Sequence, residues 1–187
     1  DSGAPRGRVA AYRVDLGVST RAAAESLGVA VGSTVTMPKS YARLAGTRAT
    51  GRSFDDRVGV AALLLAVRHL DRARLRHQVT FIWSVREETG LDGARAVAES
   101  LGTSVARVHA IDTFVSADSP LEPQNFAVAP VGSGPVARAV DQSSVTPPLY
   151  VDSLVALARR HRIPLQVGAT NGGNDGSAFA PWGVVDV

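Results

Sequence analysis

The chain has 187 residues, 45% of them hydrophobic, a length that suffices for one globular domain with a small appendage. Cysteine is absent, which excludes disulfides and thiolate metal sites, so any metal would need carboxylate, imidazole or backbone oxygen ligands. No apolar run approaches the ~20 residues that cross a bilayer, and the 20 cations, all arginine except Lys39, form no basic stripe with aromatic residues. We therefore expect a cytoplasmic protein with no nucleic-acid partner and no membrane partner.

The first 51 residues are rich in Gly, Val, Ser and Thr, and short apolar stretches alternate with Gly and Pro. The stretches at 9–14 and 33–37 predict strands of a small β-rich domain. One short helix is expected between them, because Thr20 is a good N-cap, the residues after it favour a helix, and Gly28 ends it.

From Ser53 onward, helical and strand patterns alternate along the chain. In order, the patterns predict a helix over 57–70, a strand over 78–85, a helix over 92–101 that Gly102 ends, strands over 107–111 and 126–129, a helix over 148–161, a strand over 165–168 and a final strand over 183–187. This alternation predicts an α/β fold over 52–187, in which helices flank a largely parallel sheet.

Acidic residues follow three of the predicted extended segments. They are Asp55, before the first long helix, Glu87 and Glu88, after the strand that ends at Val85, and Asp112, after the strand that ends at Ile111. Because the carboxyl ends of parallel strands gather at one edge of a sheet, these carboxylates are expected to converge. Clustered carboxylates repel one another and raise their own pKa values, so such a cluster is favoured chiefly around bound metal.

The adjacent pair Glu87 and Glu88 points to two different roles. Successive side chains of an extended backbone point to opposite sides, so the two carboxylates would make different contacts. One could ligate a metal while the other acts as general base, as in metal-assisted hydrolysis. Taken singly, Asp55 and Asp56 would suit a helix N-cap and the glutamates a solvated loop; their coincidence at one sheet edge favours a site.

Four motifs occur in a fixed order, namely GRSFDDRVG at 51–59, SVREETGLDGA at 84–94, AIDT at 110–113 and GGNDG at 172–176. In this combination the chain closely resembles the TET-type, glutamyl or deblocking aminopeptidases, whose members often carry the names cellulase or endoglucanase. The resemblance covers nearly the whole chain. It implies a zinc-peptidase-like catalytic domain over 52–187 and part of an inserted β-rich dimerisation domain over 1–51.

The resemblance also implies site residues and a reaction. Asp55 would bridge two divalent metal ions, Zn²⁺ or Co²⁺, Glu88 would bind one ion and Asp112 the other, and Glu87 would be the general base. Asp56 would follow the bridging aspartate through a peptide that is often cis in this family. The implied activity is removal of N-terminal residues from a peptide substrate by a homo-oligomer built from dimers. The segment GGNDG departs from the family's usual GGTDA, which leaves its role at the substrate side open.

The histidines depart from the family's pattern, which has a His-x-Asp ligand motif before the inserted domain and a ligand histidine late in the catalytic domain. Here the His-x-Asp string at His69 follows Asp55, out of order, and His77, His109 and His161 suit structural or solvent-facing positions. With no initiator methionine and a final strand still in progress, both ends look cut, so the ligand histidines are expected in sequence beyond them. The chain alone is then expected to bind Zn²⁺ weakly and to be inactive. A small-molecule N-acyl amidohydrolase and a non-catalytic scaffold of the same fold stay open as alternatives.

Overall fold

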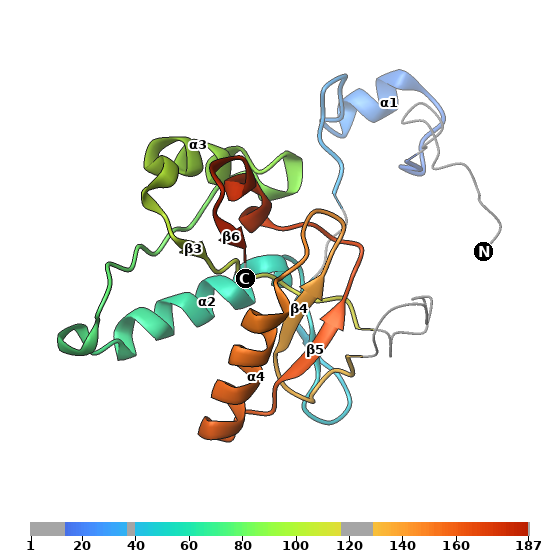
Figure 1. Cartoon of the computed structure of the whole chain (residues 1–187). Coiled ribbons are helices and arrows are strands. Elements are labelled where there is room, and N and C mark those ends of the chain that lie inside the picture. Colours follow the sequence, from blue (N-terminus) through green and yellow to red (C-terminus); the bar gives the residue numbers. More distant parts are fainter. Residues whose placement is uncertain (1–13, 37–39, 117–128, 187) are drawn as a thin grey trace. The chain divides into compact units, whose positions relative to one another are not determined.

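The computed structural model describes residues 14–36, 40–116 and 129–186 (Figure 1). The chain divides between Ser40 and Tyr41 into two units, each of which is described by itself. This division lies before Gly51, where the change in composition placed the domain boundary. The assignment of a dimerisation domain to 1–51 and of a catalytic domain to 52–187 stays a prediction.

The first unit contains a short helix where the sequence predicted one. This helix, α1 (Arg21–Ser26), begins after Thr20, whose hydroxyl accepts a hydrogen bond from the Ala23 N–H at 3.2 Å, and it ends before Gly28. The expected strands are not found within 14–36, since residues 33–36 form none. Of the other stretch, at 9–14, only Val14 is among the described residues. Met37, the last residue of the stretch at 33–37, also lies outside them.

The second unit alternates helices and strands, and its described elements are labelled in Figure 1 where there is room. In chain order they are β1 (Ala42–Arg43), β2 (Ala49–Thr50), α2 (Phe54–His69), the 3₁₀ helices η2 (Arg72–Arg74) and η3 (Glu87–Thr89), α3 (Asp92–Leu101), the 3₁₀ helix η4 (Gly102–Ser104), β3 (Arg107–Val108), β4 (Val136–Val140), α4 (Pro148–His161), β5 (Gln166–Ala169), the 3₁₀ helix η5 (Asp175–Trp182) and β6 (Val185–Asp186).

The helices of this unit confirm the local signals in the sequence. α3 and α4 have the predicted bounds, because Gly102 ends the first and prolines open the second. α2 extends from Phe54, but Asp55 and Asp56 have non-helical backbone angles, so its regular part begins at Arg57, where the sequence predicted the start. No helix within the described ranges is long and apolar enough to cross a membrane.

The strand predicted over 78–85 is wrong, because these residues form neither helix nor strand. A strand exists only through hydrogen bonds to a neighbour, and none of the described segments pairs with this one. The carbonyl of Val85 instead accepts a hydrogen bond from the Gly93 N–H at 3.0 Å, at the start of α3. The strand β4, conversely, was not predicted, and the strand predicted over 126–129 lies outside the described residues except for Ala129.

The strands pair in three two-stranded sheets within the described residues. β1 pairs antiparallel with β2, whereas β3 with β6 and β4 with β5 are both parallel. The final strand predicted from the sequence is therefore present as β6. Parallel pairs joined through helices make this an α/β unit, as the alternating pattern predicted.

One hydrophobic cluster holds α3 against the end of the chain. Ala94 and Ala98, one turn apart on α3, pack with Ala178 and Phe179 of η5 and with Val184. The small alanine side chains allow the two elements to approach closely, so α3 and η5 are fixed beside each other. Elsewhere in the unit, α4 packs along β4 (Figure 1). The candidate site is formed by residues next to the ends of these helices and strands.

Candidate active site

The two aspartates at the start of α2 take different roles. The peptide between Asp55 and Asp56 is cis, as the family resemblance implied, and Ser53 before it has a positive φ of 59°. A carboxylate oxygen of Asp56 accepts a hydrogen bond from the Gly59 N–H at 2.8 Å, so Asp56 caps the regular part of the helix. The N-cap function therefore falls to Asp56, and Asp55 lines a pocket.

Glu87 and Glu88 begin the 3₁₀ helix η3, after Arg86 with a positive φ of 61°. The expectation that the pair stands on extended backbone is therefore wrong. A 3₁₀ helix has about 3 residues per turn, which separates successive side chains by roughly 120° rather than placing them on opposite sides. The two side chains differ in burial, since Glu87 is half-buried whereas Glu88 is exposed.

The strand before Asp112 is shorter than predicted. β3 ends at Val108 and not at Ile111, so Asp112 lies four residues after the strand and not directly after it. One carboxylate oxygen of Asp112 accepts a hydrogen bond from the Thr113 N–H at 2.6 Å. The other lies 3.5 Å from a terminal nitrogen of Arg138, and the aspartate side chain is 20% exposed. Asp112 is thus held by two donors at the wall of the same pocket.

A pocket of about 540 Å³ brings the predicted site residues together, since Asp55, Glu87, Glu88 and Asp112 all line it. This is the convergence expected from the sequence. Within the part of the chain that the structure describes, no group of three or more acidic or histidine side chains is arranged to hold a metal ion. None of the four histidines lines this pocket. The metal-binding and catalytic roles of the four acids therefore stay predictions.

The acids of the pocket repel one another. Burial raises the pKa of Glu87 to about 7, and the charges of Asp112, Asp175, Glu88 and Asp55 contribute in the same direction. Burial also raises the pKa of Asp112, although the Thr113 N–H and Arg138 oppose it. A cation in the pocket would relieve this repulsion, and oxygen ligands of this kind suit a divalent ion.

Asp175, in the motif at 172–176, adds a fifth carboxylate whose charge acts on Glu87, although it does not line the pocket. One of its oxygens accepts a hydrogen bond from the Ser84 hydroxyl. The other is buried and has no hydrogen-bond partner among the described residues. A water molecule or a cation would satisfy this oxygen, so the donor chemistry of these acids suits a divalent ion, although the described side chains are not arranged as a metal site.

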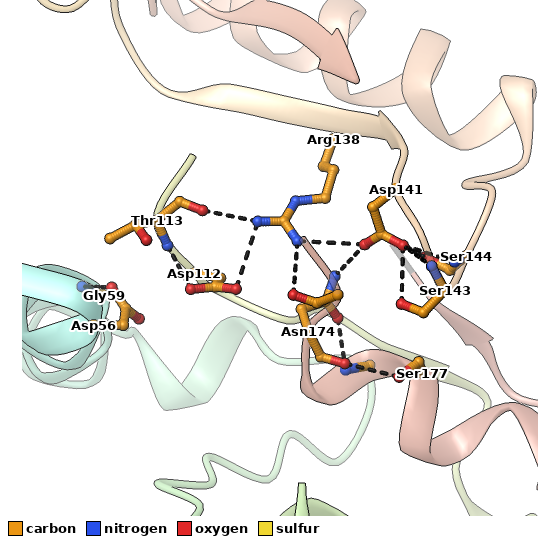
Figure 2. A network of polar contacts seen from close by, with 12 residues as sticks. Asp56, Gly59, Asp112, Thr113, Arg138, Asp141, Ser143, Ser144, Asn174 and Ser177 are labelled. Carbon is orange, nitrogen blue, oxygen red and sulfur yellow. Dashed lines mark hydrogen bonds and ion pairs between the residues drawn. The ribbon is translucent and has the colours of Figure 1, made fainter. Parts of the chain in front are cut away.

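Sequence reasoning missed a polar network behind the pocket, which Figure 2 shows around Arg138 and Asp141. The fully buried carboxylate of Asp141 accepts hydrogen bonds from the N–H groups of Ser143 and Ser144, each at 2.7 Å, from Asn174 at 3.0 Å and from Arg138 at 3.3 Å. An aspartate followed two and three residues later by serines is a signal for such a turn and could have identified Asp141.

Replacing Asp141 by alanine is expected to lower the free energy of unfolding by about 2–4 kcal/mol, because it leaves the buried amide of Asn174 and the largely buried guanidinium of Arg138 without this acceptor. Chemical denaturation measures the change. Asp152→Ala is the matched control, since Asp152 is an exposed aspartate on α4 whose removal strands no buried donor. Equal stability of the two variants would contradict the role given to Asp141.

The same variant should also change the response to acid. Burial raises the pKa of Asp141, but the hydrogen bonds from Ser143, Ser144 and Arg138 outweigh it and lower the pKa overall. A lowered folded-state pKa gives stability that is present above the ordinary aspartate pKa of about 3.9 and is lost as the pH falls through the folded-state value. The stability advantage of the wild type over Asp141→Ala should therefore shrink below about pH 4.

Comparison with solved structures establishes the class of fold. The chain superposes on the aminopeptidase from the archaeon Desulfurococcus kamchatkensis with a TM-score of 0.74 and 31% identity, covering 92% of this chain and 49% of that one. It superposes on the TET1 peptidase of Pyrococcus horikoshii with a TM-score of 0.68 and 34% identity, covering 79% and 42%. The fold is therefore that of an α/β peptidase.

The chain belongs to the M42 glutamyl aminopeptidase family, whose model matches residues 2–183. Among curated relatives, the lysyl aminopeptidase of Pyrococcus furiosus is 30% identical over 154 residues, which is 82% of this chain and 42% of that protein. The resemblance inferred from the four motifs is confirmed. The chain spans about two fifths of the length of the curated relatives that it matches.

Proposed function

We propose that this chain forms part of a metal-dependent aminopeptidase that removes N-terminal residues from peptides. The observation that carries the proposal is the convergence of Asp55, Glu87, Glu88 and Asp112 on one pocket in a chain that matches the M42 family along nearly its whole length. The free amino terminus of the substrate would bind at these acids and the ions that they hold. The cytoplasmic location expected from the sequence stays a prediction.

In this proposal Asp55, Glu88 and Asp112 would hold two divalent ions, zinc or cobalt. When bound, the ions would act as Lewis acids on the peptide carbonyl and make water nucleophilic near neutral pH. Glu87 is the general base, which takes a proton from the attacking water and passes it to the leaving amine. Without bound ions, its half-buried position and the neighbouring acids raise its pKa to about 7, and divalent ions in the pocket would lower that pKa and favour the carboxylate form that a base needs.

We also propose that the protein acts as a homo-oligomer built from dimers, with residues 1–51 as part of the dimerisation domain within a zinc-peptidase-like fold. Support comes from the TET1 peptidase of Pyrococcus horikoshii, which can assemble into a tetrahedron or a large octahedral shell. The separate compact unit before Tyr41 is consistent with a module distinct from the catalytic part. A largely parallel catalytic sheet would extend the two parallel pairs described above.

The function is tested with the whole protein, an aminoacyl amide and its N-acetylated counterpart. We expect hydrolysis of the substrate with the free amine alone, loss of turnover in excess chelator, and recovery when Zn²⁺ or Co²⁺ is restored. Cleavage of the N-acetyl group instead would identify an amidohydrolase. Stoichiometric metal binding without hydrolysis of either compound, or no metal binding at all, would favour the scaffold alternative.

A further inference from the structure

Arg138 joins the candidate metal ligand Asp112 to the network behind the pocket (Figure 2). One terminal nitrogen of Arg138 donates to the Thr113 carbonyl at 2.8 Å and to the Asp112 carboxylate at 3.5 Å. The other donates to the Gly173 carbonyl at 3.2 Å and to the Asp141 carboxylate at 3.3 Å. The guanidinium therefore contacts three segments of the chain, and its side chain is only 15% exposed.

An irregular strand places Arg138 in this position. The register of β4 with β5 shifts between Arg138 and Val140, as in a β-bulge. A bulge breaks the alternation of side chains along a strand and redirects the chain. Arg138 and Asp141, three residues apart, consequently contact each other, and Asn174 holds the same Asp141 oxygen at 3.0 Å. The guanidinium is thus fixed from the side opposite Asp112.

Substrate recognition is a weaker explanation for this arginine. Although Arg138 lines the pocket, each of its terminal nitrogens already has two acceptors in the protein. A guanidinium has four terminal N–H groups, and these four acceptors use all of them. Binding a substrate carboxylate would therefore require breaking contacts within the protein. The guanidinium instead forms an ion pair with the Asp112 carboxylate at 3.5 Å, and both side chains are largely buried.

We propose that Arg138, fixed by Asp141 and Asn174, is a positioning residue that orients the Asp112 carboxylate toward the pocket and keeps it available as a metal ligand. This inference rests on the proposed function, in which Asp112 binds one of the two ions. Each oxygen of Asp112 accepts one hydrogen bond from the protein, and a carboxylate offers about four lone-pair sites, so acceptor capacity remains for a cation. Residues that hydrogen-bond to a metal-binding side chain, without touching the metal themselves, commonly affect the affinity of the site for the metal.

The test is a Co²⁺ titration of the metal-free whole protein, followed by visible absorption and by competition with a chromophoric chelator. We expect Arg138→Met to weaken one of two binding events about 10- to 100-fold. Arg138→Lys should fall between this variant and the wild type, because an ammonium keeps the charge but not the fork of donors. Arg107→Met is the matched control, since Arg107 of β3 bonds the Tyr150 hydroxyl at 3.0 Å and does not line the pocket.

Circular dichroism in excess chelator shows which variants fold, and if Arg138→Met does not fold, Arg138→Lys decides alone. Two tight ions in the wild type, with unchanged affinity and absorption in the folded Arg138 variants, would overturn the positioning role and leave the proposed function intact. Equal weakening by Arg107→Met would also overturn it. A wild type that binds no divalent ion would instead refute the proposed function itself.

Discussion

Replacing Glu87 by glutamine is expected to lower kcat by about 10²- to 10⁴-fold while the metal content of the protein stays the same. The amide retains the size and most of the packing of the half-buried glutamate but cannot take up the proton of the attacking water. Glu87 lies beside the proposed ligands in one pocket without being assigned to an ion. Steady-state kinetics on an aminoacyl amide, together with elemental analysis of the same samples, measure both quantities.

The neighbouring glutamate provides the contrast. Glu88→Gln should reduce metal content, since Glu88 is the proposed ligand, and its activity should recover partly at high Zn²⁺ or Co²⁺. Glu99→Gln controls for the general effect of removing a carboxylate, because Glu99 is exposed on α3 and does not line the pocket. If Glu87→Gln loses metal with little loss of turnover per bound ion, the roles of Glu87 and Glu88 are exchanged.

Gly134→Ala is expected to lower the free energy of unfolding by about 3–5 kcal/mol. Gly134 has a positive φ of 102°, and a Cβ there would lie 1.5 Å from the carbonyl oxygen of Pro164. The methyl group can be accommodated only if the segments that lead into β4 and β5 move apart. That movement would break the bond from the Gln166 N–H to the Pro135 carbonyl at 2.9 Å, which begins the parallel pairing.

A second glycine, two residues earlier in the chain, separates the clash from the backbone strain. Gly132 has a similar φ of 97°, but no atom lies within 4 Å of the position of its Cβ. Gly132→Ala should therefore cost only the strain of a non-glycine residue at positive φ, about 1–2 kcal/mol. Chemical denaturation of both variants measures the difference. Equal destabilisation would mean that the approach of Pro164 to Gly134 is not a constraint on the fold.

The sequence by itself determined the features that depend on short stretches of chain. α3 and α4 were predicted with their observed bounds, because a glycine stop and opening prolines act on neighbouring residues. The order of the four motifs was likewise enough to identify the M42 family. The convergence of Asp55, Glu87, Glu88 and Asp112 followed from a general rule on strand ends, although β3 is shorter than predicted and the glutamates follow no strand.

Only the tertiary structure decided the features that need a partner distant in sequence. Residues 78–85 have the composition of a strand but form none, since pairing depends on a neighbouring strand and not on composition alone. Arg138 meets Asp112 across 26 residues and Gly173 across 35, and no local pattern encodes either contact. The acids that line the pocket could therefore be predicted from the sequence, whereas the arginine that contacts Asp112 could not, because its position depends on the register of β4 against β5.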